Sequence, residues 1–188
     1  MVSIANPPFT IDEFERLPGH ERYELVDGEL VERKMSWESS HVAMRAGRIL
    51  ATFVDARRLG FVSGADNGMQ LVPGDRTTLR YADVSFTERS RVPGGRPSEL
   101  GHQQGPPDLA VEVVSPNDLA SEVAGKVELY LSSGVRLVWV IYPDRRIVHV
   151  YRPGGPDSRL SGDDILDGED VVPGFRVPIT DLWAEPLG

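Results

Sequence analysis

The sequence contains no cysteine among its 188 residues. This absence excludes a thiol nucleophile, a zinc–thiolate site and a disulfide framework, and it fits a reducing compartment such as the cytoplasm. Long apolar runs are missing too, and the first ten residues lack the basic flank and apolar stretch of a secretory signal. We therefore expect a soluble, cytoplasmic protein with no membrane partner.

Basic residues are scarce relative to acidic ones: 20 Lys and Arg face 29 Asp and Glu, giving a net charge of -9. A broad basic surface for non-specific adhesion to nucleic acid is thereby excluded, although a local basic groove is not. The sequence also lacks a phosphate-cradling glycine motif and a GxSxG nucleophile turn, which disfavours nucleotide-binding and serine hydrolase classes. The length predicts one domain over residues 1–188, burying about 70% of the surface of the unfolded chain.

Hydrophobic periodicity and turn signals predict an α/β fold, a central mixed sheet flanked by helices and preceded by a β-hairpin. In order, we expect a helix over 10–17, a hairpin over 23–32 around Asp27-Gly28, a helix from Ser39 or Ser40 to 60, short strands at 61–62 and 69–72, a strand over 79–86, a strand over 109–113, a helix started by residues 115–118 and ended by Gly134, and strands over 137–142 and 147–151. Residues 87–107 are expected to form a long irregular loop, and loops of that length are usually functional or disordered.

The segment from 107 to 114 is the most informative one. Its apolar residues alternate with Asp108, Ala110 and Glu112, so a strand here has one apolar side and one side that carries two carboxylates. Burying an ionised carboxylate costs several kcal/mol unless a cation or several donors compensate. Glu112 therefore requires a partner, either a metal ion or a lysine.

Asp83 is the natural companion of Glu112, because both lie mid-strand in consecutive predicted strands. If the strands are neighbours, the carboxylates lie within about 5 Å of each other and could hold Mg²⁺ or Mn²⁺. Asp108 is separated from Glu112 by roughly 13 Å along one strand and cannot share that ion. The alternative is that Asp83 and Glu112 are edge carboxylates that never meet.

Two further charged residues have open interpretations. Lys126 lies at the flank of the apolar, buried side of the helix that ends at Gly134, so its side chain could reach Glu112. Alternatively, it could form an ordinary surface ion pair with Glu122 one turn earlier. Glu24, in the predicted hairpin, could supply a third carboxylate or support a water molecule, but a solvated strand face explains it equally well.

Several stretches, taken in order, resemble the bacterial putative restriction endonuclease family of the PD-(D/E)XK phosphodiesterase superfamily. They are Phe-Thr-Ile-Asp-Glu-Phe-Glu-Arg-Leu-Pro from Phe9, Tyr-Glu-Leu-Val-Asp-Gly-Glu-Leu-Val from Tyr23, Ala-Asp-Val-Ser-Phe from Ala82, Pro-Asp-Leu-Ala-Val-Glu-Val-Val-Ser-Pro from Pro107, Lys-Val-Glu-Leu-Tyr from Lys126 and Val-Trp-Val-Ile-Tyr-Pro from Val138. The resemblance covers nearly the whole chain.

This resemblance implies a restriction-endonuclease-like fold and an acidic site for a divalent metal. Asp83 matches the first metal-binding aspartate, Glu112 the acidic residue of the following strand and Glu24 a glutamate of the early hairpin. The chain departs from the superfamily pattern at Ala82, which replaces a proline, and at Val114, which replaces the signature lysine. Lys126 of the next helix fits the place to which that lysine has moved in this family.

The leading hypothesis is hydrolysis of DNA phosphodiester bonds with Mg²⁺ or Mn²⁺ held by Asp83 and Glu112, with Lys126 and Glu24 completing the catalytic set. The candidates for phosphate-backbone contacts are Arg45, Arg48, Arg57 and Arg58 of the helix and Arg89, Arg91 and Arg96 of the long loop. The alternatives are a non-catalytic binding or regulatory module, and a hydrolase of a smaller phosphodiester. A homodimer is left open.

Overall fold

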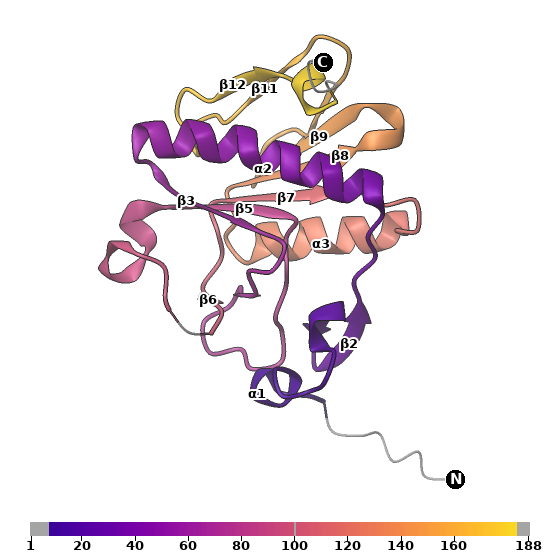
Figure 1. Ribbon diagram of the computed structural model, residues 1–188, viewed down its shortest axis with the longest axis vertical. Helices are drawn as coiled ribbons and strands as arrows, with labels where there is room; N and C mark the ends of the chain where they lie inside the picture. The colour runs from indigo at the N-terminus through magenta and orange to yellow at the C-terminus, as the bar shows by residue number, and fades with distance from the viewer. Residues whose placement is uncertain (1–7, 100, 184–188) are drawn as a thin grey trace.

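The computed structural model describes residues 8–99 and 101–183. Its central sheet contains β3 (Gly60–Gly64), β5 (Val84–Glu88), β7 (Leu109–Val113), β8 (Leu137–Tyr142), β9 (Ile147–Tyr151) and β10 (Ser158–Leu160). The spatial order is β10-β9-β8-β7-β5-β3; β7 and β8 are parallel, whereas the other neighbouring pairs are antiparallel. The predicted mixed central sheet is thus confirmed (Figure 1).

A long helix covers each face of this sheet (Figure 1). On one face, α2 (Trp37–Arg57) buries Val42, Ala46, Leu50 and Val54, which repeat at helical spacing. The same core includes apolar residues around the small sheet of β11 (Ile165–Asp167) and β12 (Arg176–Pro178). The other face is covered by α3 (Ala120–Ser132), the crossover helix between parallel β7 and β8. Strand β8 is buried on both sides, as its continuous apolar sequence predicts.

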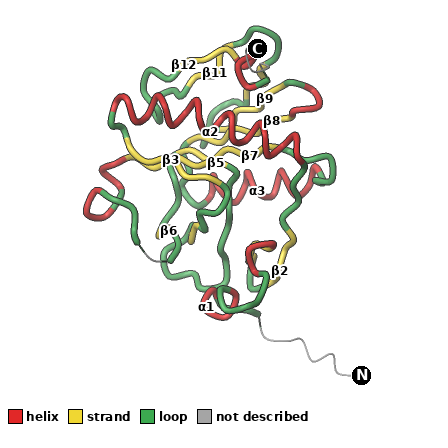
Figure 2. Tube along the Cα trace, viewed as in Figure 1, coloured by secondary structure: helices red, strands yellow, loops and turns green. Residues whose placement is uncertain are grey.

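The N-terminal part forms a smaller unit beside the sheet (Figure 2). Helix α1 (Ile11–Phe14) begins with the predicted capping box of Thr10 and Glu13 but ends earlier than the expected helix over 10–17. The hairpin of β1 (Tyr23–Val26) and β2 (Glu29–Glu32) is confirmed, with Asp27 and Gly28 both at positive φ as a tight turn requires.

The described part of the chain also contains short elements. These are β4 (Met69–Gln70), which pairs in parallel with β6 (Gln103–Gln104), and the 3₁₀ turns η1 (His20–Arg22), η2 (Arg89–Arg91), η3 (Pro93–Gly95), η4 (Pro143–Arg145) and η5 (Ile179–Leu182). The segment 87–107 was predicted to be irregular throughout, but its described residues include the end of β5, two 3₁₀ turns and a two-residue strand. No helix in the described ranges is long and apolar enough to cross a lipid bilayer.

Two helix starts differ from prediction. Helix α2 begins at Trp37, because Ser36 and not Ser39 or Ser40 is the N-cap; Ser39 closes the capping box from within the first turn. Helix α3 begins only at Ala120, since Asp118 accepts a hydrogen bond from the Ser115 amide at 2.7 Å and holds a separate turn.

The strand predicted over 79–86 is wrong at its start. Leu79 and Leu25 exchange backbone hydrogen bonds of 2.8 and 3.1 Å, and Arg80 bonds with Met69 in the same way, so these residues pair with the N-terminal unit and β4. The sheet strand β5 starts at Val84. Asp83 therefore lies immediately before the strand, not in its middle.

Candidate active site

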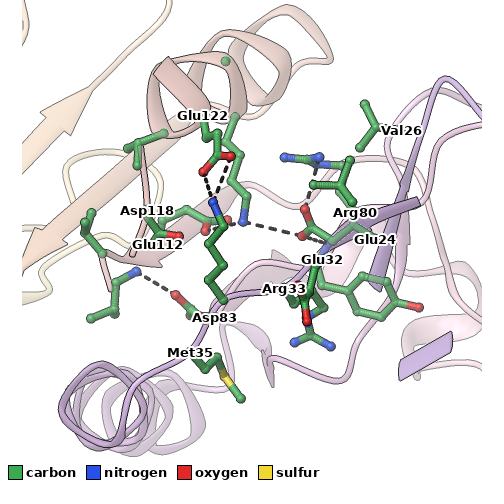
Figure 3. Close-up of a pocket in the computed structure, with 18 of the residues that line it drawn as sticks. Glu24, Val26, Glu32, Arg33, Met35, Arg80, Asp83, Glu112, Asp118 and Glu122 are labelled. Carbon is green, nitrogen blue, oxygen red and sulfur yellow. Dashed lines mark hydrogen bonds and ion pairs between the residues drawn. The ribbon is translucent and has the colours of Figure 1, made fainter. Parts of the chain in front are cut away.

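The four acidic and basic residues singled out in the sequence gather in one pocket of about 240 Å³. Its walls come from the β1–β2 hairpin, the linker over 33–36, the segment just before β5, the end of β7 and α3 (Figure 3). The pocket thus brings together segments from the first quarter of the chain to beyond its midpoint.

Strand register places the two central carboxylates side by side. Strands β5 and β7 are antiparallel and pair Val84 with Val111, so position 83 lies across from position 112 on the face covered by α3. Asp83 accepts a hydrogen bond of 2.7 Å from the Val113 amide, which fixes its carboxylate next to the end of β7 (Figure 3). The alternative of two edge carboxylates that never meet is wrong.

This arrangement perturbs the acidity of Asp83. Burial, followed by the negative charge of Glu112, raises the pKa of Asp83 to about 7, although the Val113 amide and Lys126 act in the opposite direction. With this pKa, Asp83 is only partly ionised near neutral pH. The two carboxyl groups need positive charge beside them if both are to be ionised.

Lys126 provides part of the compensation. Its ammonium lies 2.9 Å from Glu112 Oε2 and 3.5 Å from Glu24 Oε1. Burial alone would lower the pKa of Lys126, but Glu112 and Glu24 outweigh it and raise the pKa above its ordinary value, so the amine stays charged. The surface-pair alternative is wrong, because Glu122 bonds to Lys34.

Glu24 is 2% exposed and is held by three groups. Arg80 lies 3.1 Å from one of its oxygens, while the Tyr81 amide, at 3.1 Å, and Lys126 contact the other. A buried carboxylate needs such donors. The possibility of a solvated strand face is wrong.

Two residues of the site were missed in the sequence. Arg80 is itself 6% exposed, and the signal that marks it is a charged residue between the apolar Leu79 and Tyr81. Tyr130 is a buried residue of α3, and its hydroxyl donates a 2.7 Å hydrogen bond to Glu112 Oε1. A buried tyrosine usually finds a hydrogen-bond partner, which is the signal that could have found this contact.

Carboxyl groups outnumber the cations that contact them here. Glu24 and Glu112 contact the two cations of Arg80 and Lys126, and Asp83 adds a third carboxyl group beside Glu112. Among the described residues, no three His, Cys, Asp or Glu side chains form a complete metal-binding cluster. Mg²⁺ does not require one, because it is commonly held by one or two carboxylates with water and substrate phosphate as its other ligands. The Asp83–Glu112 pair fits such an ion in ligand type and charge.

The other predicted charged groups lie elsewhere. Asp108 is fully buried at the opposite end of β7 and bonds to Arg91 and Arg136, in line with the expectation that it cannot share an ion with Glu112. The arginines predicted to contact phosphates do not line the pocket; its basic residues are Arg33, Lys34, Arg80 and Lys126.

Comparison with known proteins agrees with this architecture. The family model Uma2, described as "Putative restriction endonuclease", matches residues 11–180. A solved structure of a protein from Anabaena variabilis ATCC 29413, described as a putative nuclease belonging to DUF820, superposes with a TM-score of 0.78 and 23% sequence identity, covering 94% of this chain and 98% of that one. No curated protein matches the sequence. The predicted restriction-endonuclease-like fold is confirmed.

Proposed function

The chain belongs to the Uma2 family of putative restriction endonucleases, and from this membership and the pocket geometry we propose that it hydrolyses DNA phosphodiester bonds with the help of a divalent metal. The observation that carries the proposal is the juxtaposed Asp83–Glu112 pair, whose excess negative charge Lys126 only partly offsets. Mg²⁺ or Mn²⁺ suits a pair of hard oxygen ligands.

In this proposal Asp83 and Glu112 hold the metal. When bound, such an ion lowers the pKa of a water molecule and neutralises charge on a phosphate. The other catalytic roles are assigned to side chains of the protein. Lys126 stays protonated between the two glutamates, so it can orient the attacking water or stabilise charge that develops on the phosphate.

Glu24, Arg80 and Tyr130 are assigned positioning roles. Glu24 holds Lys126 from the side opposite Glu112, and Arg80 fixes Glu24 in turn. Tyr130 is buried, and burial followed by the charge of Glu112 raises its pKa well above the ordinary value. Its hydroxyl therefore stays protonated and donates the hydrogen bond that fixes the rotamer of Glu112.

The test is a nuclease assay on plasmid and oligonucleotide DNA with Mg²⁺ or Mn²⁺. We expect metal-dependent cleavage by the wild type and its loss in Asp83→Asn and Glu112→Gln, which keep the shape of each side chain. Cleavage that survives both substitutions would rule out this site.

A smaller phosphodiester is the second candidate substrate. Two observations favour it: the pocket has a volume of only about 240 Å³, and the predicted phosphate-contacting arginines do not line it. Hydrolysis of bis(p-nitrophenyl) phosphate together with failure to cleave DNA would select this candidate. Absence of hydrolysis with either substrate would select the non-catalytic module.

A further inference from the structure

Three of the four basic side chains that line the pocket are firmly engaged. Arg80 is buried against Glu24, and Lys126 is held between two glutamates. Arg33 donates hydrogen bonds of 3.2 and 2.7 Å to the carbonyls of Glu21 and Ala65, and its guanidinium lies 4.7 Å from the centre of the Tyr81 ring. Moving any of these three groups would leave partners unsatisfied.

Lys34 is held differently. It lies in the linker between β2 and α2, and its ammonium lies 2.7 and 2.9 Å from the two carboxylate oxygens of Glu122 on α3. The Glu122 carboxylate lies beside the pocket that contains Asp83 and Glu112 (Figure 3). The ion pair thus joins the linker to α3 at the wall of the pocket.

This ion pair costs little to separate. The Lys34 and Glu122 side chains are 31% and 42% exposed, and exposed pairs contribute only about 0–1 kcal/mol. Glu122 would also keep a partner without Lys34, because one of its oxygens accepts a 3.1 Å hydrogen bond from the Leu119 amide. Lys34 can therefore leave Glu122 without stranding a buried charge.

The presence of a lysine at position 34 also favours a contact that can open. The chain has 18 arginines but only two lysines, Lys34 and Lys126, and both line this pocket. A lysine ammonium is a compact point charge on a flexible stem, which suits a contact that must change partners. An arginine is better suited to fixed contacts such as the two that Arg33 makes with the carbonyls of Glu21 and Ala65.

We propose that Lys34 binds a substrate phosphate in this pocket and that Glu122 holds its ammonium in the free protein. On binding, the ammonium exchanges the Glu122 carboxylate for the non-bridging oxygens of a phosphodiester anion. No covalent bond changes in this step. The inference rests on the proposed function, since it assigns the phosphodiester substrate a ligand beyond the metal pair and Lys126.

The test uses the opposite predictions for the two partners of one ion pair. A fluorescein-labelled single-stranded DNA oligonucleotide is titrated with the full-length protein at low salt with Mg²⁺, in an Asp83→Asn background that prevents cleavage, and anisotropy is recorded. We expect Lys34→Gln to weaken binding about tenfold and to make the salt dependence shallower by about one counterion. Glu122→Gln, which frees the ammonium and keeps a helix-capping side chain, should tighten binding about threefold.

A purely structural ion pair gives a different result. Both substitutions break the same contact, so both would lower the melting temperature alike and change DNA binding in the same direction. The matched control is the exposed pair of Arg76 and Asp12, which does not line the pocket. Arg76→Gln and Asp12→Asn make the same charge changes, and we expect each to shift binding by less than about twofold.

The outcomes separate this inference from the proposed function. Changes of the same sign, no change in either variant, or no oligonucleotide binding at all overturn the role of Lys34, even if the wild type cleaves DNA. Opposite changes support it, even if the wild type hydrolyses no DNA.

Discussion

Strand β7 has a buried carboxylate at each end, and the two are compensated in different ways. Just before the strand, Asp108 is fully buried; it lies 2.6 Å from Arg91 and 3.5 Å from Arg136, and it accepts a 2.8 Å hydrogen bond from the Glu88 amide. Arg136 also lies 2.6 Å from Asp170, so two carboxylates meet two cations there. At the other end, the three carboxyl groups of Glu24, Asp83 and Glu112 lie near only two cations, Arg80 and Lys126.

The comparison shows that burial of a carboxylate does not by itself mark a functional site. Asp108 is the more deeply buried of the two, yet its charge is matched by Arg91 and by the Arg136 that it shares with Asp170. It anchors the start of β7 to the loop over 87–107 and to the segment before β8. At the Glu112 end carboxyl groups outnumber the cations, and burial followed by the charge of Glu112 raises the pKa of Asp83. We therefore assign structure to the first end and propose chemistry at the second.

The largest expected effect separates the two ends by activity. Glu112→Gln should lower metal-dependent hydrolysis by about a thousandfold or more, because it removes a proposed metal ligand. Asp108→Asn should leave kcat/KM of the folded fraction within about threefold of the wild type. Initial rates normalised to the folded fraction check this contrast. Equal losses in both variants would remove the distinction on which the comparison depends.

The next effect separates the ends by stability. Asp108→Asn leaves Arg91 and Arg136 without their common carboxylate, so it should lower the free energy of unfolding by about 2–3 kcal/mol. Because each arginine side chain is 38% exposed, the loss should stay below that of a fully buried pair. Urea unfolding followed by circular dichroism measures the change, and a loss below about 0.5 kcal/mol would mean that the anchor is weak.

In metal-free protein, Asp83→Asn should raise the free energy of unfolding, whereas Asp108→Asn should lower it. The pKa of Asp83 is about 7 in the folded state against 3.8 as its ordinary value, so the folded state binds this proton more tightly. The stabilisation from protonated Asp83 is complete below a pH of 3.8 and is lost as the pH rises through about 7. Asparagine cannot ionise, so the Asp83→Asn variant keeps this stabilisation as the pH rises.

We therefore expect Asp83→Asn to be more stable than the wild type by about 1–2 kcal/mol at a pH of about 8 in EDTA, with the difference disappearing toward a pH of about 4. Unfolding curves across this pH range provide the measurement. A difference that does not depend on pH would show that Asp83 carries no raised pKa.

The smallest effect concerns Tyr130. Tyr130→Phe keeps the packing of α3 but removes the 2.7 Å hydrogen bond to Glu112, so we expect a loss of about 1 kcal/mol in stability. Activity should fall several-fold through kcat, with KM nearly unchanged, because the substitution affects how Glu112 is positioned. A change confined to KM would contradict a positioning role.

Local sequence signals predicted much of the fold. The Asp27-Gly28 turn, the alternation of β7 and the continuous apolar run of β8 are each determined by neighbouring residues, and the corresponding elements are present. The errors arose where several partners compete. Ser36, Ser39 and Ser40 are all acceptable helix caps. Residues 79–82 have a strand pattern, but Leu79 and Arg80 pair with the hairpin and β4. One domain over residues 1–188 stays a prediction.

The site was predicted less completely than the fold. Asp83, Glu112, Lys126 and Glu24 followed from the alternation pattern and the family resemblance, and the structure brings them into one pocket. Arg80 and Tyr130 contact the set through the packing of β1 and α3, which local periodicity does not specify. The Lys34–Glu122 pair joins residues 88 positions apart, and such a pairing cannot be read from sequence spacing.

Mn²⁺ binding measured by titration calorimetry tests the central claim most directly, since it requires neither a substrate nor turnover. The account predicts one Mn²⁺ per chain in the wild type and in Asp108→Asn, and affinity weakened at least about thirtyfold in Asp83→Asn and Glu112→Gln. Unchanged affinity in the latter two variants, or no binding by the wild type, would contradict it.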